Sequence, residues 1–426
     1  MFTPFLLLLA GAAAAAKKTA TARWINTWTA MPQLTEFNNL PPAPFNGTTN
    51  VFFNSTIRQT LHMSIGGDTI RIRFSNAFGV NNLNIAAATV ALPAGGVSGA
   101  SAVIPASIQP LTFSGNPTFS IPNAGIVVSD PISFPIKPQQ TITVTLYLAG
   151  GQNGFSITSH PGSRATTWLQ LGNAVSAENI TGPSVTSLAH WYFVSAVETL
   201  TTPSASAFFI VGDSITDGRG SDTDGNDRWP DLLLARMQKN APTSLISVNN
   251  QAAGGNRILA DGLGPAALGR IERDVLAQTG KVKYAMIFEG VNDIGTADTS
   301  ETTQQAVGDQ LIAAFKQIST IVHAQGIPFF AGTITPFSAP ANVTIQPYSN
   351  PIREKQRQRI NTFIRTSPDV FDAVVDFDKV IADPQIPSQL ASQFNSGDFL
   401  HPNVAGYTAM AAAFPLDLFA KFADGV

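Results

Sequence analysis

The sequence predicts a two-part fold in which an all-β sandwich domain precedes an α/β domain with a doubly wound parallel sheet. Two observations carry this prediction. Residues 23–200 show hydrophobic alternation with period two, whereas residues 204–426 show short apolar runs that alternate with longer helix-like segments. The chain has 426 residues, of which 44% are hydrophobic, and this is enough to bury two cores.

Residues 1–22 precede both parts, and we expect them to be a secretory signal peptide. The apolar run from Phe5 to Ala16 has the length of a signal-peptide core and is too short to span a bilayer. Ala14-Ala15-Ala16 and Ala20-Thr21-Ala22 both fit small-residue cleavage sites. We therefore expect a secreted, extracellular protein without a membrane anchor, because no later segment has the roughly 18 uninterrupted apolar residues of a spanning helix.

The composition excludes several classes of function. Charged residues make up 12% of the chain, and no basic run exceeds the pair Lys17-Lys18, so nucleic acid is not an expected partner. Cysteine is absent, which excludes disulfides and thiolate catalysis. Four Asn-x-Ser/Thr sequons are candidate glycosylation sites in a secreted protein, namely Asn46, Asn54, Asn179 and Asn342.

The first part reads as a series of half-buried strands. Ile70, Ile72 and Phe74 alternate with Arg71 and Arg73, which is the period-two pattern of a strand with one buried face. The segment Gly66-Gly67-Asp68 lies between two apolar runs and predicts a tight hairpin. Helical periodicity is nearly missing, which favours a β-sandwich.

The second part begins after the small-residue stretch Thr201 to Ser206, where strands and helices start to alternate. This alternation is typical of a doubly wound parallel sheet. The expected strands are 207–211, 245–248, 284–288, 328–333 and 373–377, and the expected helices are 229–238, 271–278, 302–324, 352–365 and 405–422.

Candidate catalytic residues follow the apolar runs, because open α/β sheets bind ligands outside the carboxyl ends of their strands. The first run leads into Gly212-Asp213-Ser214, and a serine at such a strand-to-helix turn presents its hydroxyl for attack. Thr216 stands where the nucleophile elbow of α/β-hydrolases has its second glycine, so that motif is excluded. Asp213 is expected to support the turn through hydrogen bonds.

Three further segments supply the rest of a hydrolytic site. Residues 250–257 contain adjacent glycines, whose backbone amides can approach a ligand closely. Asn292, after the third run, is a neutral amide donor. Near the C-terminus, Asp398 and His401 are spaced so that the carboxylate can bind one ring nitrogen while the other faces Ser214.

These four segments, GDSITDG, AAGGNR, GVND and DFLH, resemble the four sequence blocks of the SGNH (GDSL) hydrolase family, in the same order. The resemblance covers about half of the chain and implies a flavodoxin-like fold. The β-rich part is also similar, less specifically, to that of extracellular GDSL-like lipases and acylhydrolases with an N-terminal β-sandwich, including acetylxylan-esterase-like members.

The resemblance implies Ser214 as nucleophile, His401 as general base and Asp398 as its orienting partner. It implies an oxyanion hole made of the Ser214 amide, the Gly255 amide and the Asn292 side chain, with Gly254 as the alternative to Gly255. No metal or organic cofactor is expected.

The implied function is a secreted serine esterase that removes carboxylic, chiefly acetyl, esters from extracellular carbohydrate, with acetylated polysaccharide as its substrate. One alternative is a lipase-like or general short-chain esterase, which an apolar acyl channel would favour. Another is an inactive glycan-binding protein, against which the intact triad and oxyanion positions argue.

Overall fold

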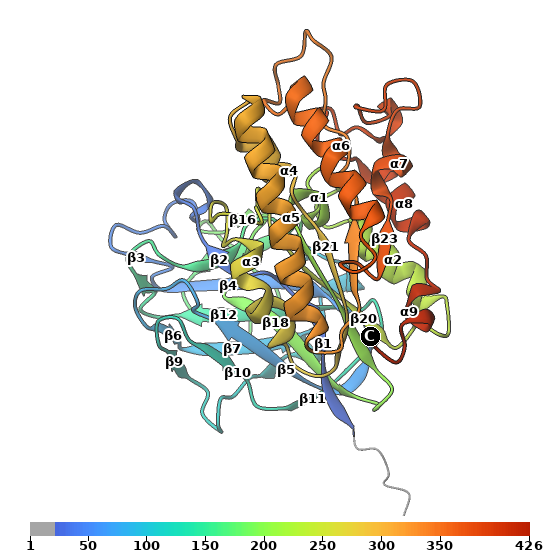
Figure 1. Cartoon of the computed structure of the whole chain (residues 1–426). Helices are drawn as coiled ribbons and strands as arrows, with labels where there is room; N and C mark the ends of the chain where they lie inside the picture. The colour runs from blue at the N-terminus through green and yellow to red at the C-terminus, as the bar shows by residue number, and fades with distance from the viewer. Residues whose placement is uncertain (1–21) are drawn as a thin grey trace, which may run out of the picture.

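The computed structural model describes residues 22–426. The predicted signal peptide, residues 1–22, lies outside this range except for Ala22. Within the described residues the chain forms a β-rich part followed by an α/β part, as predicted, and the two lie side by side (Figure 1).

The α/β part is built on a five-stranded, fully parallel sheet with the strand order β20-β19-β21-β22-β23. Numbered from its first strand this order is 2-1-3-4-5, which is the doubly wound, flavodoxin-like order that the resemblance implies. The central strand β19 is buried throughout and β21 is buried from Tyr284 to Phe288, because both faces of the sheet are covered, and this explains the apolar sequence of these stretches. The strands are β19 (Ser206–Gly212), β20 (Ile246–Ala252), β21 (Val282–Phe288), β22 (Phe329–Gly332) and β23 (Ala373–Val375).

The helices form two groups around this sheet. Helices α3, α4, α5 and α6 contact one another, and α2 and α7 contact α8 (Figure 1). Their bounds are α1 (Ser214–Asp217), α2 (Trp229–Gln238), α3 (Ala267–Ile271), α4 (Val291–Thr296), α5 (Glu301–His323), α6 (Pro351–Thr366), α7 (Phe377–Ile381), α8 (Val404–Ala413) and α9 (Leu418–Lys421).

Two helix predictions need correction. The helix predicted over 405–422 is interrupted, because α8 ends at Ala413 and Phe414 is extended before Pro415. Proline has no N–H to donate and disfavours helical backbone in the residue before it. The helix predicted over 271–278 starts earlier, as α3, and continues as one π-turn over Glu272–Leu276.

The β-rich part consists mainly of two antiparallel sheets that enclose one core. The first has the order β1-β18-β5-β10 with β11 beside β5, and the second has the order β16-β15-β4-β12-β7-β8. Buried residues of both sheets, such as Ile57 and Leu146 from one and Ile72 and Val197 from the other, belong to a single apolar cluster. The principal strands are β1 (Arg23–Thr29), β4 (Ser55–His62), β5 (Gly67–Ser75), β7 (Ala87–Ala91), β8 (Gln109–Pro110), β10 (Ile126–Val128), β11 (Ile132–Ile136), β12 (Thr141–Leu148), β14 (Thr158–His160), β15 (Thr167–Leu171), β16 (Thr186–Leu188), β17 (Trp191–Tyr192) and β18 (Val194–Thr201).

The tight hairpin predicted at Gly66-Gly67-Asp68 is wrong. Strand β4 pairs with β12 and β15, whereas β5 pairs with β18, β10 and β11, so this connection passes from one sheet to the other. At the crossing, Met63 donates its backbone N–H to Gln140 and Ser64 donates its own to Thr27. The backbone groups that a hairpin would pair are therefore satisfied by other strands.

The two parts share a tight boundary. Ile25 and Ile65 come from the β-rich part but are buried in the apolar cluster of the α/β part. The Ser64 hydroxyl donates to the backbone oxygen of Val248, in the edge strand β20, at 2.7 Å. The β-rich part is thus docked against the α/β sheet through apolar and hydrogen-bonding contacts.

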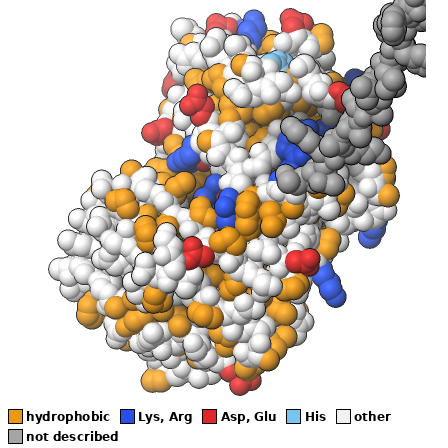
Figure 2. Space-filling view, turned by 90° about the horizontal axis from the view of Figure 1, so that it is seen from below, with side chains coloured by type: hydrophobic (Ala, Val, Ile, Leu, Met, Phe, Trp, Pro, Cys, Tyr) orange, Lys and Arg blue, Asp and Glu red, His pale blue; other side chains and the backbone are white. Residues whose placement is uncertain are grey.

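The face seen in Figure 2 carries few charged side chains, in line with the low charge of the whole chain. Among residues 22–426, no helix is both long enough and apolar enough to cross a membrane.

Candidate active site

Ser214 lies directly after the carboxyl end of β19, as the first residue of the short helix α1. Asp213 caps this helix by accepting a hydrogen bond from the backbone N–H of Ile215 at 2.9 Å, which is the supporting role expected for it. Burial raises the pKa of Asp213 well above the usual range of an aspartate. Ser214 is buried, and as the first helical residue its N–H has no partner within the helix.

His401 and Asp398 lie beside this serine, on the loop that precedes α8. The distance from His401 Nε2 to Ser214 Oγ is 2.7 Å, and His401 Nδ1 lies 2.6 Å from Asp398 Oδ2. The other carboxylate oxygen of Asp398 accepts the backbone N–H groups of Leu400 and His401. The structure therefore brings the three predicted residues into one hydrogen-bonded chain across 187 residues of sequence.

Both titrating members of this chain have shifted pKa values. Burial lowers the pKa of His401, the hydrogen bond and charge of Asp398 oppose this, and the charges of Arg219 and Arg164 lower it further. Burial also acts to raise the pKa of Asp398, but the bond to His401 and the two backbone N–H groups outweigh it and hold that pKa well below its usual range. The histidine is thus disposed to be neutral and the aspartate ionised near neutral pH.

The glycine segment follows β20, which pairs with β19. The backbone amides of its two glycines differ in their hydrogen bonds. The N–H of Gly254 donates to Asp217 Oδ2 at 2.9 Å. The N–H of Gly255 has no hydrogen-bond partner among the described residues. Gly255 has a φ of +71°, a left-handed backbone that glycine adopts without strain. Of the two amides left open by the sequence, that of Gly255 is available to a ligand.

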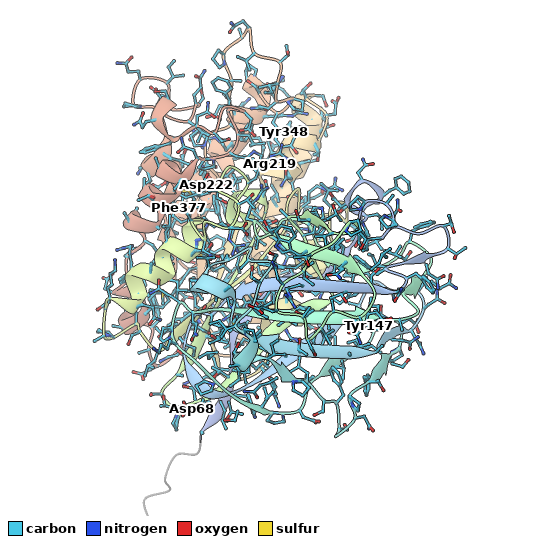
Figure 3. All side chains as sticks on the ribbon, turned by 180° about the vertical axis from the view of Figure 1, so that it is seen from behind. Asp68, Tyr147, Arg219, Asp222, Tyr348 and Phe377 are labelled. Atoms are coloured by element: carbon cyan, nitrogen blue, oxygen red, sulfur yellow. The ribbon has the colours of Figure 1, made fainter. Side chains whose placement is uncertain are left out.

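Asn292, after β21, is held in a defined orientation. Its amide nitrogen donates to the backbone oxygen of Asn256 at 2.8 Å, which leaves its second N–H, and its oxygen accepts the Tyr348 hydroxyl at 2.9 Å. The Tyr348 hydroxyl therefore fixes the orientation of the Asn292 amide group, and with it the position of the N–H donors. Figure 3 labels Tyr348 and Arg219, which both belong to the α/β part.

A buried arginine joins the loops that carry these groups. Arg270 bonds to Asn256 Oδ1, to the backbone oxygen of Gln251 and to Glu289, with distances between 2.6 and 3.1 Å. Burial raises the pKa of Glu289 to about 7, although the charge of Arg270 opposes that shift. The ends of β20 and β21 are thereby linked beneath the site.

Comparisons with known proteins identify the family of the α/β part. Residues 208–414 match the family model described as GDSL-like lipase/acylhydrolase. They belong to the GDSL-like lipase/acylhydrolase family. This GDSL domain is therefore that of a carboxylic ester hydrolase, and the predicted family and α/β fold are confirmed.

Solved structures with low sequence identity also resemble the GDSL domain. An acetyl xylan esterase from Geobacillus stearothermophilus is 20% identical, with 49% of this chain and 92% of that chain covered and a TM-score of 0.37. A GDSL-like lipase from Bacteroides thetaiotaomicron is 16% identical, with 49% and 85% covered and a TM-score of 0.35. No curated protein matches the chain.

Sequence reasoning missed four residues that support the site of the GDSL domain. Tyr348 and Arg270 carry no motif, and Asp217 was quoted only as part of the nucleophile block. His160 belongs to none of the four sequence blocks, yet it reaches Asp217 from the β-rich part. Only the folded chain brings these side chains together, so no local sequence pattern could have found them.

Proposed function

We propose that this protein is a secreted serine esterase that hydrolyses acetyl esters of extracellular carbohydrate through an acyl-enzyme. The observation that carries the proposal is the hydrogen-bonded chain from Ser214 through His401 to Asp398, at the carboxyl edge of a parallel sheet.

The reaction would proceed in two acyl transfers. In the first, His401 Nε2 accepts the Ser214 proton while Oγ attacks the ester carbonyl, and the same proton then passes to the departing alcohol. In the second, water attacks the acyl-enzyme, again with His401 as base, and releases the carboxylic acid. The ionised Asp398 holds the ring with its Nδ1 proton directed at the carboxylate and stabilises the imidazolium that forms.

Three donors would stabilise the tetrahedral oxyanion, namely the Ser214 and Gly255 amides and the Asn292 side chain. The amide of Gly255 is preferred over that of Gly254, because Asp217 already occupies the latter. Removing one such donor typically lowers kcat by about 10²–10³-fold.

A polar rim supports a carbohydrate alcohol as the leaving group. Arg219 is exposed and close enough to His401 to lower its pKa, and Asp222 lies nearby (Figure 3). Such donors and acceptors suit a polyhydroxylated substrate better than a long acyl chain.

Secretion is supported by the apolar N-terminal run. Two of the four sequons, Asn179 and Asn342, have exposed asparagines, as glycosylation in the secretory pathway requires. Asn46 and Asn54 are half-buried, and the oxygen of Asn54 accepts the Tyr147 hydroxyl at 2.7 Å. We therefore propose Asn179 and Asn342 as the glycosylated sites.

Ester hydrolysis by the wild type and by Ser214→Ala tests this function on three substrates, p-nitrophenyl acetate, a long-chain p-nitrophenyl ester and acetylated xylan. We expect the wild type to release acetate from xylan and the variant to lose at least about 10³-fold in kcat, because it lacks the nucleophile. Activity confined to long chains would instead assign a lipase-like function. Binding to xylan without hydrolysis of any ester would instead assign a glycan-binding function without catalysis.

A further inference from the structure

One side chain of the β-rich part contacts a carboxylate beside the active site. His160, at the end of β14, places Nε2 at 2.8 Å from Asp217 Oδ1, and its Nδ1 lies 3.0 Å from the backbone oxygen of Met31. Both side chains of the pair are almost completely buried, with 3% and 4% exposed. The ring therefore lies between two hydrogen-bond acceptors, the Asp217 carboxylate and the Met31 backbone oxygen.

The same carboxylate of Asp217 continues toward the candidate oxyanion hole. Its second oxygen, Oδ2, accepts the backbone N–H of Gly254 at 2.9 Å. The next residue, Gly255, carries the free amide, so one hydrogen-bonded path runs from His160 through Asp217 to the glycine pair. Two adjacent glycines have the widest backbone freedom, and an external bond is needed to hold them in one conformation.

Two further contacts fix this path. A Cβ added at Gly162 would lie 1.7 Å from Asp217 Oδ2, so the turn after His160 lies directly against the carboxylate. Trp191, which pairs with His160 in the sheet, stacks on the histidine ring with centroids 5.7 Å apart and planes at 24°. The ring is therefore held on a rigid platform of the β-rich part and not on a mobile loop.

We propose that His160 is a positioning residue of the esterase reaction. It holds Asp217 through a buried hydrogen bond, and Asp217 in turn fixes the Gly254 amide so that the Gly255 amide can stabilise the oxyanion. The β-rich part thus completes the oxyanion hole of the α/β part. This inference rests on the function proposed above.

The chain offers a matched control in a second histidine–aspartate pair. His323 Nε2 lies 2.8 Å from Asp372 Oδ2, and that carboxylate oxygen accepts the backbone N–H of Phe329 at 2.7 Å. As in the path through His160, Asp217 and Gly254, an aspartate joins a histidine to a backbone N–H, but here one carboxylate oxygen makes both contacts and the two side chains are 28% and 16% exposed. This second path links the end of α5 to the amino end of β22. Ser214, in contrast, follows the carboxyl end of β19.

Kinetics of His160→Leu, His160→Gln and His323→Leu on p-nitrophenyl acetate test the proposal, with Ser214→Ala alongside. We expect His160→Leu to lower kcat by about tenfold with KM changed less than about twofold, because a displaced donor affects the transition state more than substrate binding. Glutamine keeps one N–H donor and should restore part of the loss. His323→Leu should retain the wild-type kcat.

Two further variants test the route through Asp217. Gly162→Ala displaces the Asp217 carboxylate and leaves His160 intact, so it should lower kcat in the same way. This variant tests the same path if His160→Leu fails to fold. In an Asp217→Asn background, His160→Leu should cost less than about twofold more, since both act through one bond. The proposal is overturned if His160→Leu and Gly162→Ala retain wild-type kcat while Ser214→Ala is inactive, or if His323→Leu loses as much as His160→Leu. An active Ser214→Ala would instead contradict the proposed function itself.

Discussion

At the scale of single residues, the site depends on opposing effects on His401. Burial lowers the pKa of the ring, whereas the hydrogen bond and charge of Asp398 raise it, and the net shift is downward. A general base must be unprotonated to act, so activity is lost when the pH falls below its pKa. A lowered pKa therefore extends activity toward acid.

This sets the pH dependence of kcat/KM. We expect the acid limb of the wild-type profile to have its midpoint below about 6.5, the ordinary value for histidine, and activity to be level from there to neutral pH. Asp398→Asn removes the contribution that raises the pKa of His401, so the limb should move to still lower pH while the plateau falls by about 10²-fold or more. The profiles are measured on p-nitrophenyl acetate. An acid limb at or above pH 7, or one that moves upward in Asp398→Asn, would contradict this account.

At the scale of elements, catalytic side chains are positioned by strand ends and by the loops that follow them. The loop of Asp398 and His401 is the longest-range contribution, and the Asn395 side chain helps to hold its backbone. Asn395 Oδ1 accepts the N–H groups of Gly397 and Phe399, at 2.9 and 3.0 Å. Phe399 has a φ of +59°, a strained conformation for a residue with a side chain, so this loop needs such support.

Asn395→Ala is therefore expected to lower kcat by roughly tenfold without a comparable change in KM, because His401 loses its alignment with Ser214. A suitable control is Asp383→Ala, since Asp383 Oδ1 also accepts two backbone N–H groups, those of Gln385 and Ile386, in an exposed loop. That variant should keep its kcat. Steady-state kinetics of both variants test this prediction. Equal losses of kcat would contradict it, because they would show a general effect on folding and not an effect on the loop of His401.

At the scale of the whole molecule, the sequence was a good guide wherever the pattern is local. All five parallel strands of the α/β part overlap the apolar runs that predicted them, because strands buried on both faces are rich in apolar residues. Strand β20 extends to Ala252, beyond the predicted 245–248, and the prediction ended early because the second half of the strand is polar. The helix break at Pro415 had a visible signal in the proline itself. The crossing at Gly66 had none, because a tight turn and a passage between sheets use the same residue types.

The same reasoning separates the predicted from the unpredicted parts of the site. Ser214, Asp398 and His401 were found because they belong to recognisable blocks at strand ends. His160 lies in the β-rich part, 57 residues before its partner Asp217, and its contact exists only because the two parts dock. The site therefore depends on the boundary that residues 23–200 share with residues 204–426, to which Ile25 and Ile65 contribute. Whether the two parts are separate domains is less important for the site.

The central claim is that Ser214 is the nucleophile, and covalent trapping with diethyl p-nitrophenyl phosphate tests it most directly. The account predicts complete loss of esterase activity, one diethylphosphoryl group per chain by intact mass, and a modified peptide that contains Ser214, with no adduct on Ser214→Ala. An adduct on another residue, or full esterase activity in an unmodified Ser214→Ala protein, would contradict it.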